Sequence, residues 1–250
     1  MSLKRFVLKE GAILVADAHC APWRPAFIDF LRAVESKEIR TPQLILMGDV
    51  FDLLFGDIDA TLTLNRDSIA LLNTLAERVE ILYLEGNHDF RLTTLFPHIK
   101  VVPRQQQPLI AAFGEQKIAL SHGDTHMGIG YAIYTALIRN GTILKVLNRL
   151  DQWRGEFIVK RLIAMMKGKH HCRSIDNFSE LIRKRLFGAA ASEADVIIEG
   201  HFHQNIAFEL ARGVRYINLG AFACNERYYG VQSFHNRIIL EEVFLSKEPR

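Results

Sequence analysis

The sequence predicts an α/β fold built around a mostly parallel sheet. In the first half of the chain, short apolar runs alternate with segments of helical spacing. This β-α-β-α-β order is typical of parallel sheets whose crossover connections are right-handed. The chain of 250 residues is long enough to bury one large core. We therefore expect a single domain over residues 1–250.

The elements of the first half follow from the apolar runs. A proline directly before the first helical segment suits the first turn of a helix. In chain order, the expected elements are a strand at Ala12–Val15, a helix at Ala26–Ile39, a strand at Gln43–Met47, a helix at Leu62–Arg78 and a strand at Val79–Leu84.

The second half begins with short strands and continues with a long helical stretch. The expected strands are Lys100–Val102, Pro108–Phe113 and Lys117–Leu120, then Asp195–Glu199, Ile206–Leu210, Val214–Leu219 and Ile238–Phe244. Between the two sets, three helices are expected at Tyr131–Leu150, Phe157–Lys167 and Asn177–Phe187. We interpret this stretch, about residues 128–190, as a helical insert.

Composition points to a globular protein outside the bilayer. Hydrophobic residues make up 49% of the chain and charged residues 24%. No apolar run reaches the roughly 20 residues that span a membrane, and the start of the sequence lacks a secretory apolar region. We expect a cytoplasmic location. The three cysteines, Cys20, Cys172 and Cys224, show no paired spacing and are expected to be reduced thiols.

Charge is distributed unevenly along the chain. The net charge is +3, yet residues 128–190 alone hold twelve Lys and Arg against four Asp and Glu, a net of +8. The remainder therefore carries 3 − 8 = −5. A basic helical insert on an acidic body indicates an anionic partner such as phosphate, nucleic acid or a lipid surface. An ordinary solvated helical surface explains the charge equally well.

Five short segments carry metal-ligand residues, and four of them directly follow a predicted buried strand. Side chains at the carboxyl ends of neighbouring strands can converge on one point. The segments are Asp17-Ala18-His19, Gly48-Asp49-Val50-Phe51-Asp52, Gly86-Asn87-His88-Asp89, Ser121-His122-Gly123-Asp124 and Gly200-His201-Phe202-His203.

The residue types in these segments suit two divalent cations. Asp17 and His19 alternate, so on an extended strand end they point the same way, and the pair in Gly200-His201-Phe202-His203 does likewise. The Asp49 carboxylate has two oxygens and can bridge two ions. Ligands of mixed nitrogen and oxygen without thiolates favour manganese, iron or zinc. We expect two Mn²⁺ ions, with iron or zinc as alternatives.

As a set, the five segments resemble the motifs of the calcineurin-like metallophosphoesterase superfamily. The resemblance implies a four-layer αββα sandwich of two mixed sheets. It implies that Asp17, His19, Asp49 and His203 hold one metal, and that Asp49, Asn87, His122 and His201 hold the other. It also implies that His88 stabilises the transition state or protonates the leaving oxygen, and that Asp89 orients His88.

Within the superfamily, the chain resembles the UDP-2,3-diacylglucosamine pyrophosphohydrolases of lipid A biosynthesis. The Gly-Asn-His-Asp-Phe run ending at Phe90 and the run that starts at His122 support this, together with the basic helical insert. The resemblance implies hydrolysis of the acylated nucleotide sugar to UMP and 2,3-diacylglucosamine 1-phosphate. One departure is His88, because the best-known branch carries arginine there, so the chain belongs to a divergent branch or to a different phosphoesterase.

The insert has two interpretations. Its interleaved apolar and basic residues suit a lid over an acylated, phosphorylated substrate that rests on the anionic inner-membrane surface. They also suit an ordinary helical subdomain packed on the sandwich. Lys167, Lys169 and Arg173 are the candidate contacts to phosphate or lipid. The rival functions are a nuclease or phosphodiesterase and a broad phosphatase; few aromatics are available for stacking bases, which makes nucleic acid the weaker candidate.

Overall fold

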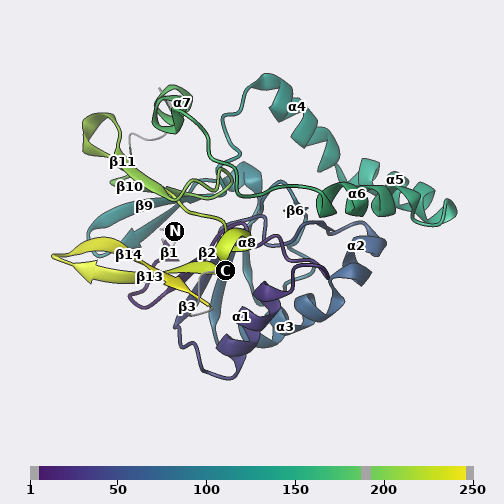
Figure 1. Ribbon diagram of the computed structural model, residues 1–250, viewed down its shortest axis with the longest axis horizontal. Coiled ribbons are helices and arrows are strands. Elements are labelled where there is room, and N and C mark those ends of the chain that lie inside the picture. Colours follow the sequence, from purple (N-terminus) through teal and green to yellow (C-terminus); the bar gives the residue numbers. More distant parts are fainter. Residues whose placement is uncertain (1–5, 187–192, 246–250) are drawn as a thin grey trace, which may run out of the picture.

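Two sheets stack face to face because their strands carry apolar side chains on both faces. The computed structural model describes residues 6–186 and 193–245 (Figure 1). The first sheet has the order β14 (Arg237–Phe244), β13 (Arg227–Phe234), β2 (Ile13–Val15), β3 (Gln43–Leu46), β5 (Glu80–Leu84) and β7 (Lys100–Val102). The second has the order β1 (Phe6–Val7), β8 (Leu109–Phe113), β9 (Gln116–Ser121), β10 (Val196–Glu199), β12 (Arg215–Asn218) and β11 (Ile206–Glu209).

The expected parallel core is present in the first sheet. Strands β2, β3, β5 and β7 pair in parallel, whereas β13 and β14 extend the sheet in the antiparallel sense. In the second sheet, β10 lies parallel between β9 and β12. A separate parallel pair joins β4 (Leu54–Phe55) to β6 (Asp89–Phe90). Strands β1, β4, β6 and β13 were not predicted from the sequence.

Alternate residues of one strand face opposite layers, and this builds four layers. Ile81 of β5 packs with helices α1 (Ala26–Glu35) and α3 (Arg66–Ala76), while the next residue, Leu82, packs with Ile198 between the sheets. On the outer face of the second sheet, Ile197 packs with Ile182 of α7 (Phe178–Arg185). The predicted αββα sandwich is confirmed, with α1 and α3 on one side and α7 on the other (Figure 1).

Two predicted helices are each broken into two by an asparagine. The expected helix at Leu62–Arg78 is α2 (Asp59–Leu64) followed by α3, and Asn65 between them donates its side-chain amide to Leu53 O and Thr61 O at 2.8 Å. The expected helix at Tyr131–Leu150 is α4 (Ile129–Ile138) followed by α5 (Gly141–Trp153). There Asn140 Oδ1 accepts from the first backbone amides of α5, which starts a new helix.

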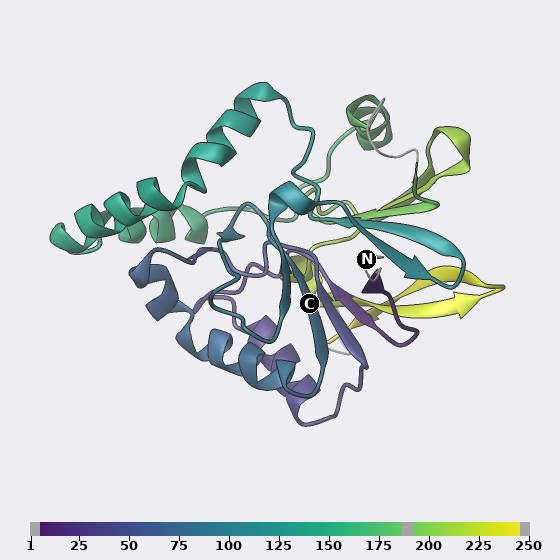
Figure 2. The same cartoon turned by 180° about the vertical axis from the view of Figure 1, so that it is seen from behind.

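The insert lies in sequence between β9 and β10, as predicted. It consists of α4, α5, α6 (Phe157–Lys167) and α7, and the end predicted at residues 187–190 lies outside the described residues. Figures 1 and 2 show α4, α5 and α6 extending beyond the edges of the sheets. A short helix, α8 (Phe222–Asn225), follows β12. None of the described helices combines the length and the apolar character that crossing a bilayer requires.

Candidate metal centre

The structure brings all seven predicted metal ligands to one place. They lie in loops after β2, β3, β5, β9 and β10, at the carboxyl ends of these strands. The ligand atoms of Asp17, His19 and Asp49 lie within 4.8 Å of one another, and so do those of Asp49, His122 and His201. Asp49 is common to both groups, so its carboxylate can bridge two ions.

Of the two remaining predicted ligands, one lies at each of these groups. Asn87 Oδ1 lies 3.2 Å from His122 Nε2, and His203 Nε2 lies 3.2 Å from Asp17 Oδ1. Asn87 therefore lies at the group of His122 and His201, and His203 lies at the group of Asp17 and His19.

Five of the seven side chains leave the backbone from left-handed conformations. The φ angles of Asp17, His19, Asp49, His201 and His203 lie between 44° and 64°. The expectation that Asp17 and His19 alternate on an extended strand end is therefore wrong, because β2 ends at Val15. The same expectation for His201 and His203 is also wrong, because β10 ends at Glu199. Such conformations are uncommon for residues other than glycine and gather at functional sites, where the surrounding fold holds them.

Buried nitrogen atoms in the centre suit divalent cations. His19 Nδ1 and Nε2 and His203 Nε2 are buried without a hydrogen-bond partner among the described residues. Burial lowers the pKa of His201 to about 4 and holds the pKa of His19 well below its usual value, so both imidazoles are neutral and offer lone pairs. Burial raises the pKa of Asp49, yet the neighbouring His122, His88 and His19 together outweigh burial, hold this pKa well below its usual value and keep the carboxyl ionised. The donor set fits two divalent ions.

Asp89 does not orient the His88 ring, which was its expected role. Its carboxylate accepts hydrogen bonds from the backbone amides of residues 49, 50, 51 and 86 and from the hydroxyl of Tyr83. It therefore ties the loop after β3 to the loop after β5. The His88 ring instead has Nδ1 at 2.8 Å from the main-chain oxygen of Asp52, so Asp89 positions the loops rather than this imidazole.

His88 faces the insert across the site. Its Nε2 lies 3.0 Å from Lys169 Nζ, which comes from the loop after α6. Because the carbonyl of Asp52 requires a proton on Nδ1 and an ammonium group donates, Nε2 accepts from Lys169 in this arrangement. A residue of the insert therefore reaches the side chain expected to act on the leaving group.

The other two predicted substrate contacts have different neighbours. Lys167 Nζ lies 5.1 Å from the ring centroid of Trp23. Arg173 lines a pocket of about 380 Å³ that also includes His203 and Arg227. Contact of Lys167, Lys169 and Arg173 with substrate stays a prediction.

Two residues at the centre were missed as site residues. Asp52 Oδ1 lies 3.2 Å from His19 Nδ1, and Arg24 Nη1 donates to Asp52 Oδ2 at 3.2 Å. The repeated acidic residue in Gly48-Asp49-Val50-Phe51-Asp52 was a signal for Asp52. His171, in the insert, lies in one metal-ligand group with His19 and His203. His171 does not directly follow a strand, so its position in the sequence did not mark it as a metal ligand.

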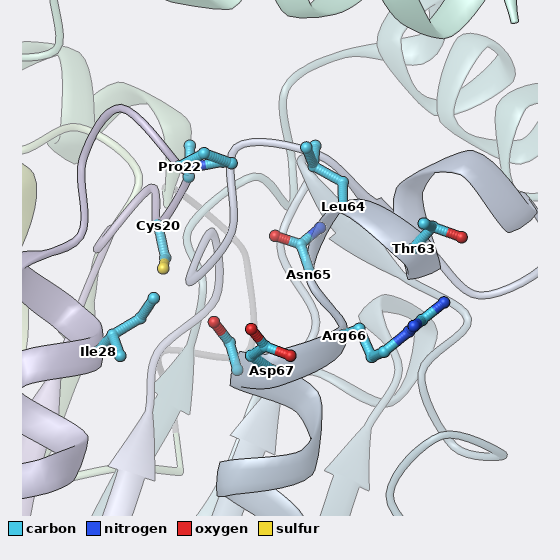
Figure 3. Close-up of a pocket in the computed structure, with 10 residues that line it drawn as sticks. Cys20, Pro22, Ile28, Thr63, Leu64, Asn65, Arg66 and Asp67 are labelled. Carbon is cyan, nitrogen blue, oxygen red and sulfur yellow. The ribbon is translucent and has the colours of Figure 1, made fainter.

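The cysteines correct a further expectation. Cys172, in the insert, forms a disulfide with Cys224 of α8, with Cα atoms 5.6 Å apart. The sequence separation of 52 hides the pairing, because only the fold brings this part of the insert to α8. Cys20 is free and buried, and it lines a pocket of about 430 Å³ beside Ile28 and Asp67 (Figure 3).

We expect the folded protein to show no reactive thiol in the absence of reductant. Burial raises the pKa of Cys20 to about 12, so its reactive thiolate is scarce at neutral pH, and the other two cysteines are bonded. Titration with a coloured disulfide reagent should detect one thiol after unfolding and three after unfolding and reduction. Three thiols before reduction would contradict the disulfide.

The chain is similar to known proteins in sequence and in fold. The sequence model described as "Calcineurin-like phosphoesterase" matches residues 12–205. The UDP-2,3-diacylglucosamine hydrolases of Salmonella arizonae and Salmonella newport are each 22% identical to the chain, over 80% of it and 85% of their own length. A dimetal phosphatase from Danio rerio is 14% identical, with a TM-score of 0.47 and coverage of 94% and 96%. A phosphoesterase from E. coli is 16% identical, with a TM-score of 0.43 and coverage of 94% and 99%.

Proposed function

The chain belongs to the calcineurin-like phosphoesterase family, and we propose that it hydrolyses the pyrophosphate bond of UDP-2,3-diacylglucosamine. The products would be UMP and 2,3-diacylglucosamine 1-phosphate, as in lipid A biosynthesis. The observation that carries the proposal is Asp49, whose carboxylate belongs to both clusters of metal-binding side chains in a metal-dependent phosphoesterase. The relatives named UDP-2,3-diacylglucosamine hydrolase support the substrate.

The residues of the centre have separable tasks in this reaction. Asp17, His19, Asp49 and His203 would hold one ion, and Asp49, Asn87, His122 and His201 the other. When bound, the two ions, which we propose to be Mn²⁺, activate the attacking water and offset charge on the phosphate oxygens. His88 and Lys169 face each other beside these residues and would act on the leaving oxygen.

The surface of the insert favours an acylated substrate. Its helices α4, α5 and α6 expose large apolar side chains next to basic ones, which suits acyl chains and an anionic leaflet. We propose that the protein works at the cytoplasmic face of the inner membrane. The exposed apolar residues include Ile129, Ile133, Leu137, Val146, Leu150, Trp153, Phe157 and Met165. The exposed basic residues include Lys145, Arg149, Arg154, Lys160 and Arg161.

A panel of substrates with added Mn²⁺ tests the proposed function. It contains UDP-2,3-diacylglucosamine, UDP-sugars without acyl chains, cyclic nucleotides, bis-p-nitrophenyl phosphate and single-stranded DNA. We expect a preference for the acylated substrate by orders of magnitude in kcat/KM. Equal turnover with and without acyl chains would overturn the lipid assignment, and preferred cleavage of DNA with steep salt dependence would favour a nuclease.

We expect Lys169→Ala to lower kcat/KM for the acylated substrate by roughly 10- to 100-fold, because the variant loses a charge-assisted hydrogen bond at the reacting phosphate. Steady-state kinetics measure the change. Lys9→Ala is the matched control, since Lys9 is exposed outside the insert and its Nζ lies 2.6 Å from Glu80 Oε2. Equal kcat/KM for both variants would contradict the proposed contact of Lys169 with the substrate.

A further inference from the structure

One histidine of the insert is buried in the metal centre. His171 lies between α6 and α7 and is 8% exposed, although its neighbours His170 and Cys172 are exposed. Its ring lies over that of His19, with centroids 4.0 Å apart and an interplanar angle of 38°. Neither ring nitrogen has a hydrogen-bond partner in the described part of the chain. A buried imidazole without a partner is costly unless something binds it.

The backbone of the same residue orients a metal ligand. His171 O lies 2.5 Å from His203 Nδ1, and it accepts a hydrogen bond from this nitrogen when the proton is there. That proton leaves the Nε2 lone pair of His203 free, and this atom lies 3.2 Å from Asp17 Oδ1. A carbonyl that fixes the tautomer of a ligating histidine is a regular feature of metal sites.

The segment that carries His171 is fastened to the strand end that carries Asp17. The disulfide joins Cys172 to Cys224 of α8. The first backbone amides of α8 reach back to the end of β2, since Phe222 N donates to Ala16 O at 2.9 Å and Ala223 N donates to Asp17 O at 3.2 Å. The insert is therefore held in place beside the metal-binding loop.

We propose that His171 is a further ligand of the ion that Asp17, His19 and His203 hold. The ligand atoms of His19, His171 and His203 lie within 4.8 Å of one another. Imidazole nitrogen suits manganese, iron and zinc alike. The inference rests on the proposed function and deepens it, because the insert then completes the metal site as well as covering the substrate.

Metal titration of variants tests this proposal without any assay of activity. His171→Ala removes the imidazole and keeps the carbonyl that faces His203, and His171→Gln keeps most of the bulk. The matched control is His170→Ala, which removes the exposed neighbouring imidazole. Metal-depleted proteins are titrated with Co²⁺, and calorimetry and visible absorption follow the stoichiometry, the affinity and the coordination.

We expect both His171 variants to bind one of the two ions at least roughly tenfold more weakly and to change the Co²⁺ spectrum, while the His170 variant equals the wild type. Cys224→Ser, which leaves His171 in the chain but releases its segment, should weaken the same ion. Wild-type affinity and spectrum in all three site variants would overturn the proposal and leave the proposed function standing. A wild-type protein that binds no Co²⁺, Mn²⁺ or Zn²⁺ would instead overturn the proposed function.

Discussion

Gly86→Ala is expected to destroy the dinuclear site although it adds a single methyl group. A Cβ atom at Gly86 would lie 2.2 Å from Asp49 Oδ1 and 2.3 Å from the backbone nitrogen of Asp49. The second contact involves main chain, so no side-chain rotation relieves it. The loops after β3 and β5 would therefore have to separate. The Asp89 carboxylate opposes that separation, because it accepts hydrogen bonds from backbone amides of both loops.

Elemental analysis and thermal unfolding measure this effect. We expect the variant to lose both ions because Asp49 serves both clusters, and overpacking should lower the free energy of unfolding by about 1–3 kcal/mol. Turnover should fall with metal content. Gly130→Ala is the matched control, because a Cβ at Gly130 of α4 meets nothing within 4 Å. A Gly86 variant that keeps two tightly bound ions would contradict the geometry assigned to Asp49.

The layered fold could be predicted because strands buried between two layers leave continuous apolar runs in the sequence. Runs such as residues 44–47 and 81–84 are apolar on both faces, as strands between two layers must be. The helix boundaries were harder, since Asn65 and Asn140 interrupt helical periodicity by side-chain hydrogen bonds that depend on the surrounding fold. Strands such as Arg227–Phe234 alternate less clearly and were missed.

The centre was predictable where its residues sit in local motifs at strand ends. The seven ligands follow strands, and the structure brings them together. His171 and the Cys172–Cys224 disulfide depend instead on the fold of a long insert over the site, which no local spacing encodes. The left-handed backbone at Asp17 and His19 was likewise invisible, because nothing in these residue types marks a positive φ.

His88→Ala is expected to cut turnover by about 10²- to 10⁴-fold and to leave both ions in place. The ring of His88 contacts the main-chain oxygen of Asp52 and the ammonium group of Lys169, while its backbone amide donates to Asp49 Oδ1 at 2.8 Å. Alanine keeps that amide, so the bridging carboxylate keeps its support. Steady-state kinetics and elemental analysis are run together, with His98→Ala, an exposed histidine, as the matched control. Loss of metal in proportion to turnover would count against the assigned role.

A series of leaving groups separates the two roles that remain open for His88. If His88 protonates the leaving oxygen, the loss of turnover in His88→Ala must grow as the leaving group becomes more basic. The reason is that p-nitrophenolate leaves without being protonated, whereas an alkoxide must take up a proton. If it only stabilises charge on the phosphate, the loss is the same across the series. Since Lys169 donates toward the same nitrogen, His88→Ala and Lys169→Ala should not be additive, and the double variant should lose less than the product of the single losses. Additive losses would mean that the two side chains act independently on the substrate.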